Sequence, residues 1–293
     1  MNILVFGADN QLGHSYTQLL KQNATEFIIL REDEPVLSDP VSLKQLLLEK
    51  RISQLVNISL DPGLFQSERT IEKARQQQLI QACTHLLRAA KANRIPLILH
   101  SSAAVFDGSN PKPYLESDSC KAKNPLGKLA YSLEKKVEKY EKHLILRTEG
   151  MFSKDRAEFF QSCIRLCKDQ KGKLHLLDQR CSPTPADDVA RVILAINKQL
   201  DCDAMNWGLF HYCALQATHR HTFVEKFLKE AAGYDKELSN CLEHLEIITE
   251  QSSKTQLENS VLDCHHIMSS FGIKQRSREA AVKELIASMY LLK

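Results

Sequence analysis

Residues 2–13, NILVFGADNQLG, run an apolar stretch directly into a glycine turn and the start of a helical pattern. A buried parallel strand reads as a continuous apolar run, as residues 2–6 do. A helix that begins just after the glycines points its free N–H groups and the positive end of its dipole at a bound pyrophosphate. The stretch predicts a dinucleotide-type strand, turn and helix, with the alternative that the glycines serve only close packing.

The turn itself carries the first candidate binding residues. Glycine stands at positions 7 and 13, and Asn10 stands midway, where dinucleotide-binding turns of this spacing have a further glycine. Asparagine tolerates positive φ better than most residues, so the turn can form, while its side chain takes up space near the phosphates. We predict that the cofactor contacts this turn at Gly7, Asn10, Gln11, Leu12 and Gly13.

Strands and helices alternate through the first half of the chain. Apolar runs predict further strands at residues 26–30, 54–58, 97–100 and 143–147, and helix-period stretches separate them. This alternation is typical of a parallel sheet wound with right-handed crossovers. We therefore predict an α/β fold with a Rossmann-like doubly wound parallel sheet.

The second half is less regular. We predict that residues 1–150 form the dinucleotide-binding domain and that residues 151–293 form a smaller substrate-binding lobe whose elements partly return to the sheet. Within that lobe, residues 242–260 are predicted as a loop around Ile247-Ile248-Thr249.

Bulk composition limits the classes of protein to consider. The 293 residues are 43% hydrophobic, and 39 basic residues are nearly matched by 36 acidic ones, for a net charge of +3. This balance gives no support to nucleic acid or an anionic membrane as partner. No apolar run approaches the ~20 residues of a spanning helix, and residues 1–6 lead into a folded motif without the cationic region of a signal peptide. We expect a cytoplasmic protein.

The nine cysteines include no Cys-x-x-Cys pair, and their odd number suits free thiols in a reducing compartment. Cys163 and Cys167 lie one helical turn apart, yet no histidine accompanies them at ligand spacing. His219 and His221 are interpreted as surface or capping histidines. No metal site is predicted.

Further motifs stand in fixed order along the chain: VFDG at 105–108, PYLESD at 113–118, LILRT at 144–148, SPT at 182–184, DDVA at 187–190 and NSVLD at 259–263. With residues 1–13, they resemble the dTDP-4-dehydrorhamnose reductase family of extended short-chain dehydrogenases. The matches span most of the chain. The resemblance implies NADP or NAD as cofactor and a nucleotide sugar as substrate.

Other cofactor contacts follow from the resemblance. Asn57 and Ser59 lie where the family's third strand ends and the cofactor passes. Arg31, directly after the second strand, is placed to hold the 2′-phosphate of NADP, whereas Glu32 and Asp33 beside it favour the free ribose diol of NAD. The choice between the two cofactors stays open.

The family's chemistry uses a tyrosine, a lysine four residues later and a Ser/Thr hydroxyl. A carbonyl that accepts hydride needs a proton on the forming alkoxide, and a phenol delivers it near neutral pH only beside a cation. Ser102 occupies the hydroxyl position. Ala103 and Ala104 replace the family's Asp-Tyr, which removes a carboxylate and an aromatic ring.

The tyrosine and lysine positions are apolar here. Counting forward from the start of the helix puts them on Leu129 and Leu133. Counting back from the following strand puts them on Leu126 and Ala130, and Gly127 then matches the glycine after the family tyrosine. Neither count yields the pair.

A Tyr-x-x-x-Lys does occur slightly later, at Tyr131 and Lys135, on one helix face. A shift of two or five residues rotates this pair by about 200° or 140° away from the family position. Tyr131 and Lys135 with Ser102 are the candidate catalytic residues if the chain is an active enzyme.

The substrate side also departs from the family. Gln256 and Leu257 replace an Arg-Pro thought to face the nucleotide-sugar phosphates, so a bidentate phosphate contact is lost. Arg147 and Arg180 remain as candidate substrate contacts, with the alternative that both are structural.

Two hypotheses follow. The first is an NAD(P)-binding protein with weak or lost reductase activity and a binding or regulatory role. Its partner is expected to be a nucleotide-sugar-like small molecule or a protein, a homodimer included. The alternative is an active NAD(P)H-dependent reductase or epimerase of a nucleotide sugar.

Overall fold

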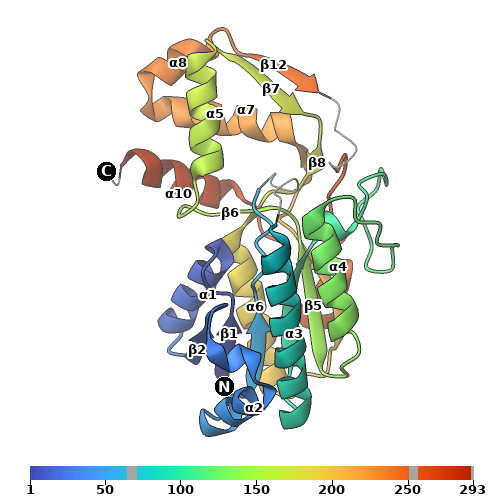
Figure 1. Ribbon diagram of the computed structural model, residues 1–293. Helices are drawn as coiled ribbons and strands as arrows, with labels where there is room; N and C mark the ends of the chain where they lie inside the picture. The colour runs from blue at the N-terminus through green and yellow to red at the C-terminus, as the bar shows by residue number, and fades with distance from the viewer. Residues whose placement is uncertain (65–70, 251–256, 292–293) are drawn as a thin grey trace.

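The computed structural model describes residues 1–64, 71–250 and 257–291, which form a sheet lobe and a smaller upper lobe (Figure 1). The sheet lobe contains a six-stranded parallel sheet in the order β10-β5-β4-β3-β1-β2. The predicted α/β doubly wound sheet is confirmed. The strands are β1 (Asn2–Phe6), β2 (Glu26–Leu30), β3 (Gln54–Asn57), β4 (Leu97–Ser102), β5 (His143–Thr148) and β10 (Gly208–Tyr212).

Helices cover both faces of this sheet. The chain moves outward from β1 to β2 and then back across to β3, and right-handed crossovers in opposite directions place their helices on opposite faces. None of the helices in the described ranges is long and apolar enough to cross a membrane. Helices α1 (Gln11–Gln22) and α6 (Ala186–Asp201) pack together, and a second row consists of α2 (Pro40–Glu49), α3 (Lys73–Asn93) and α4 (Pro125–Val137).

The reversal of direction between β1 and β3 determines where a ligand would lie. In open parallel sheets, ligands bind at the carboxyl ends of the strands, where the strand order reverses. Gly7 follows β1 there, and Asn57 ends β3. The carboxyl ends of these strands face the upper lobe (Figure 1).

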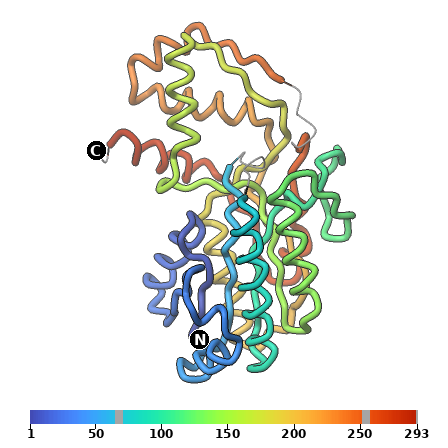
Figure 2. The backbone as a smooth tube through the Cα atoms, viewed as in Figure 1, coloured from blue at the N-terminus to red at the C-terminus, as the bar shows by residue number. Residues whose placement is uncertain are grey.

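The upper lobe has its own hydrophobic core, which includes Phe160 and Phe227. Residues beyond Met151 supply both lobes, because α6 and β10 return to the sheet while the C-terminal helix lies with the upper lobe (Figure 2). The remaining elements are β6 (Met151–Phe152), α5 (Glu158–Asp169), β7 (Lys173–Leu177), β8 (Arg180–Cys181), β9 (Thr184–Pro185), β11 (Thr218–His219), α7 (Arg220–Ala231), α8 (Lys236–Leu242), β12 (Glu246–Glu250), α9 (His265–Phe271) and α10 (Glu279–Tyr290), with short 3-10 turns η1 (Pro35–Ser38), η2 (Ala103–Val105) and η3 (Ala232–Tyr234).

One sequence prediction was wrong. Residues 246–250, predicted as part of a loop, form β12, which pairs in parallel with β7. The segment carries Ile247, Ile248 and Thr249, whose β-branched side chains favour extended backbone. The strand is mostly exposed, so it lacks the continuous apolar run that marks the central strands. Its partner lies more than 70 residues earlier in the chain.

Gly13 tests how closely the first turn of α1 packs against the β1–α1 turn that precedes it. A Cβ at Gly13 would lie 2.2 Å from the backbone oxygen of Ala8, whereas a Cβ at Gly233 meets nothing within 4 Å. We expect Gly13→Ala to lower the free energy of unfolding by about 1–3 kcal/mol, as overpacking does. Gly233→Ala should stay within about 0.5 kcal/mol of the parent protein. Urea unfolding measures both, and equal effects would contradict the close packing.

Candidate functional site

The turn between β1 and α1 passes close to the loop after β3. Gly7 has φ +80°, and a Cβ there would lie 2.3 Å from the Cα of Ser59. Only glycine fits at this position, because both the backbone conformation and the close approach exclude a side chain. The turn after β1 and the loop after β3 are therefore in direct contact at Gly7.

Asn10 works differently from the sequence prediction. Its φ of −121° is extended, so its tolerance of positive φ is not used. The side chain caps α1 by accepting a hydrogen bond from the Gly13 N–H at 2.9 Å. It also donates to the carbonyl of Gly7 at 3.0 Å and to that of Ile58 at 2.6 Å. Asn10 therefore joins the turn to the loop after β3.

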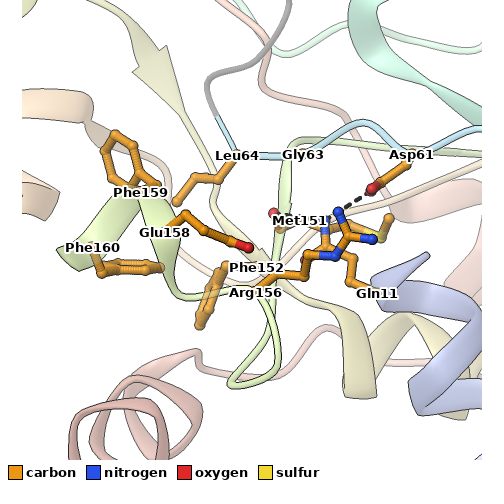
Figure 3. Close-up of a pocket in the computed structure, with 10 residues that line it drawn as sticks. All are labelled: Gln11, Asp61, Gly63, Leu64, Met151, Phe152, Arg156, Glu158, Phe159 and Phe160. Carbon is orange, nitrogen blue, oxygen red and sulfur yellow. Dashed lines mark hydrogen bonds between the residues drawn. The ribbon is translucent and has the colours of Figure 1, made fainter. Parts of the chain in front are cut away.

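A cavity of about 490 Å³ opens beside this turn, between the two lobes (Figure 3). Figure 3 shows the Arg156 guanidinium on the same side of the cavity as Gln11 and Asp61, with Phe159 and Phe160 on the other side. Arg156 also donates to the backbone oxygen of Asp9 at 3.5 Å. The lining residues are Gln11, Asp61, Gly63, Leu64, Met151, Phe152, Arg156, Glu158, Phe159 and Phe160.

Gln11 is the predicted cofactor residue whose side chain reaches this cavity. Its amide nitrogen donates to Asp61 at 2.9 Å and to the Met151 carbonyl at 3.4 Å. Its amide oxygen is buried and accepts no hydrogen bond from the residues that the structure describes. An unsatisfied buried acceptor is costly, so a donor from a ligand or a water molecule is expected there.

The other predicted cofactor residues contribute in different ways. Leu12 is fully buried in the core, so only its backbone N–H faces the turn. Asn57 accepts hydrogen bonds from both the N–H and the hydroxyl of Ser59, which shapes the loop after β3. Arg31 is exposed after β2, and the neighbouring Glu32 is paired with Arg75 at 3.0 Å.

A second, smaller cavity of about 30 Å³ adjoins the first, and Gly63 lines both. Ser102 ends β4 here, and its hydroxyl accepts a hydrogen bond from the Ala104 N–H at 3.1 Å. The lining residues are Pro62, Gly63, Ser102, Ala103, Ala104, Leu126, Glu149, Gly150, Gln179, Leu257 and Ser260. Gln256, the other replacement in the family's Arg-Pro, lies outside the described residues.

The structure places Leu126, not Tyr131, at the cavity of Ser102. Asn124 caps α4 by accepting from the Gly127 N–H at 2.8 Å, and this cap fixes the start of the helix. Tyr131 is 36% exposed, with the Lys135 ammonium 5.2 Å from its ring centre. Lys135 also pairs with Glu138 at 2.8 Å. The Tyr131–Lys135 pair thus lies on the outer surface of α4.

Arg147 is not available to a substrate, which corrects the sequence prediction. Its guanidinium is buried and makes two hydrogen bonds to the carboxylate of Glu134, at 2.7 and 2.9 Å. It also lies 5.1 Å from the ring centre of Phe106. A buried arginine needs such a bidentate partner, because an unpaired charge inside the protein is strongly destabilising. Arg147 is therefore structural.

Arg180 also has a protein partner. Its guanidinium donates to the carbonyl of Pro111 at 2.6 Å. Its backbone exchanges hydrogen bonds with Glu258 and Ser260, at 2.8 and 3.0 Å. Arg180 thus ties the segment around residue 111 to the segment that precedes α9, and it lines neither of the two cavities.

Glu149 is the site residue that the sequence analysis missed. It lines the Ser102 cavity and accepts hydrogen bonds from the Ser182 N–H and the Ser260 hydroxyl, both at 2.7 Å. Burial raises the pKa of Glu149 to about 7, although these hydrogen bonds act in the opposite direction. The available signal was its position directly after β5, at the edge of the sheet where ligands bind.

A family model described as the RmlD substrate binding domain matches residues 1–291. The chain belongs to the RmlD substrate binding domain family. The resemblance to dTDP-4-dehydrorhamnose reductases is confirmed at the level of the family. The chain is 26% identical to the dTDP-4-dehydrorhamnose reductase of Escherichia coli (strain K12), over 99% of this chain and 98% of that protein.

Solved structures share the fold along its whole length. A dTDP-4-dehydrorhamnose reductase from Clostridium acetobutylicum has a TM-score of 0.79 and 21% identity, with 99% of both chains covered. Another, from Bacillus anthracis, was solved in complex with NADP and has a TM-score of 0.72 and 17% identity, with 100% of this chain and 99% of that chain covered.

The raised pKa of Glu149 predicts a pH dependence of stability. The folded state holds this proton more strongly than the unfolded chain, whose glutamate pKa is about 4.5. The proton on Glu149 therefore adds to the free energy of unfolding in full below pH 4.5, and this contribution is lost as the pH rises to about 7. The loss amounts to up to about 3 kcal/mol.

Glu149→Gln should lack this loss, because the amide does not titrate. Urea unfolding at pH 5 and pH 8 gives the change in unfolding free energy with pH for each protein. The contributions of the other titrating groups cancel when the parent and the variant are compared. A parent protein and a variant with the same change in unfolding free energy between the two pH values would contradict the assignment.

Proposed function

We propose that this chain binds an NAD(P)-type dinucleotide at the N-terminus of α1 and has weak or lost reductase activity. Leu126, where the count back from β5 puts the family's tyrosine, lines the Ser102 cavity, and this single observation carries the proposal. The protein would act by binding, as a regulatory partner of another protein or as a sensor of a nucleotide-sugar-like molecule.

The residues at the turn fit a dinucleotide. The first N–H groups of a helix lack partners within the helix and favour an anion. Gly7 lets the turn lie against the loop after β3, and the buried oxygen of Gln11 lacks a donor in the described part of the chain. Arg156 adds a cation beside the turn. The similar protein from Bacillus anthracis was solved with NADP.

Under this proposal, the site lacks the family's tyrosine as proton donor. A bound reduced nicotinamide would supply hydride to a carbonyl carbon, and the alkoxide oxygen that forms would need a proton. Leu126 and Ala130 cannot donate one, and a missing general acid typically lowers the rate by roughly 10²–10⁴-fold. Ser102 keeps a hydroxyl at the cavity, which can orient a carbonyl but needs a partner to transfer a proton.

A second candidate function is an active reductase or epimerase of a nucleotide sugar that uses a different acid. Glu149 favours it, because this carboxyl lines the Ser102 cavity and its pKa lies at about 7. An acid of that pKa is half protonated at neutral pH. Loss of turnover in Glu149→Gln, with no change in Tyr131→Phe, would select this second function.

Restoring the family pair is the direct test of the first proposal. We expect the parent protein to oxidise NADPH slowly with dTDP-4-dehydrorhamnose, and Tyr131→Phe to leave that rate unchanged. The double change Leu126→Tyr and Ala130→Lys puts a phenol at the Ser102 cavity and an ammonium one helical turn further along α4. It should raise the rate by at least about tenfold, part of what a general acid contributes.

The matched control is Leu126→Phe with Ala130→Lys, which carries the same ring and the same lysine without the phenol hydroxyl and should bring no gain. Thermal unfolding checks that each variant is folded. Fast turnover by the parent protein that is abolished by Tyr131→Phe would overturn the proposal.

Arg31 tests the dinucleotide independently of catalysis. If its guanidinium meets the 2′-phosphate, the charge-assisted hydrogen bond contributes roughly 1.5–3 kcal/mol. Arg31→Ala should then weaken NADPH binding and leave NADH binding unchanged, as measured by calorimetry. Lys21→Ala, on the last turn of α1, serves as a charge-matched control. Failure of both cofactors to bind at millimolar concentration would refute the dinucleotide site.

A further inference from the structure

Three metal-ligating side chains meet at the base of the upper lobe. Asp178 lies between β7 and β8, His219 ends β11, and His221 lies in the first turn of α7. One ligand atom from each lies within 4.8 Å of the other two. The carboxylate of Asp178 is 2.9 Å from Nδ1 of His219 and 3.8 Å from Nδ1 of His221.

The backbone holds these side chains together. β8 and β11 form an antiparallel pair in which Arg180 lies opposite His219. The Arg220 N–H donates to the Gln179 carbonyl at 2.8 Å. Gln179 and Arg220 each lie next to a ligand, so the backbone at the three ligands is held together before any ion binds, which lowers the entropy cost of binding.

We propose that Asp178, His219 and His221 form a binding site for a Zn²⁺-like divalent transition metal. Two imidazoles and one carboxylate are a donor set that zinc accepts, and three protein ligands leave the fourth position to water. The Nδ1 atom of His221 is buried and has no hydrogen-bond partner within the described ranges, so an ion would satisfy it. Hard cations such as Mg²⁺ prefer oxygen ligands.

An ion at this site would stabilise parts of both cavities. Gln179 follows Asp178 directly and lines the Ser102 cavity. Arg220 lies between the two histidines, and its guanidinium is 5.7 Å from the ring centre of Phe159, which lines the larger cavity. Asp178 and His219 are about half exposed, so an ion can enter from solvent. The inference does not depend on the proposed function.

The experiment titrates Zn²⁺ into the chelator-treated full-length protein and follows the heat of binding and the thermal midpoint. In this experiment the reference protein and all variants carry Cys202→Ser, because Cys202 is the exposed cysteine and could bind zinc on its own. This reference protein is called the parent below. We expect one ion per chain and a higher midpoint. Asp178→Asn, His219→Ala and His221→Ala should each weaken zinc binding by more than about tenfold. Loss of a residue that only orients a metal ligand already lowers affinity by about that factor, and loss of a ligand should cost at least as much.

His175→Ala is the matched control. His175 pairs with Glu250 at 2.8 Å in the same lobe, and no second imidazole is grouped with this pair among the residues described. Its zinc affinity should equal that of the parent. Co²⁺ should give visible absorption without the thiolate charge-transfer band of a cysteine ligand.

Three outcomes would overturn the proposal. One is equal zinc binding by the parent and by the triple variant of the three ligands. Another is an equal loss of affinity in His175→Ala. The third is Mg²⁺ binding as tight as Zn²⁺ binding, which would show an unselective acidic surface.

Discussion

The buried ion pair between Glu134 and Arg147 fixes how α4 lies on the sheet. Arg147 projects from β5 and Glu134 from α4, and their side chains are 3% and 0% exposed. Ser101, on β4, donates to the same carboxylate. Losing either charged partner would cost about 3–5 kcal/mol, because the other charge would stay buried alone. The helix can therefore neither rotate nor slide relative to β4 and β5, and this constraint places its other side chains.

The composition of the Ser102 cavity follows from this constraint. Tyr131 lies five positions after Leu126, which corresponds to about 140° of rotation beyond a full helical turn. With Glu134 held against the sheet, Leu126 lines the cavity and Tyr131 lies at the surface. Bringing Tyr131 to the cavity would require α4 to turn and the buried pair to separate. The surface tyrosine and lysine are thus excluded from the cavity by the same contact that stabilises the fold.

The sequence predicted the features that depend on neighbouring residues. The apolar run before Gly7 predicted β1, and the alternation of apolar and helix-period stretches predicted the parallel sheet. Contacts between distant segments were not predictable in this way. Asn10 caps α1 but also reaches Ile58, 48 residues away, and β12 is extended because β7 pairs with it. For Arg147 both a substrate contact and a structural role stay open in the sequence, because no local pattern marks Glu134 as its partner.

Two regions at the carboxyl ends of the strands, the N-terminus of α1 and the Ser102 cavity, differ in which atoms supply their chemistry. At the N-terminus of α1, the donors that favour an anion are main-chain N–H groups, which stay when side chains change. Asn10 replaces a glycine and still leaves the N–H groups of Gln11 and Leu12 out of its own hydrogen bonds. In the Ser102 cavity a proton must come from a side chain, so the chemistry there depends on which residues line the cavity, Leu126 and Glu149 among them. Anion binding by the main chain at α1 therefore does not depend on which side chain stands at position 126.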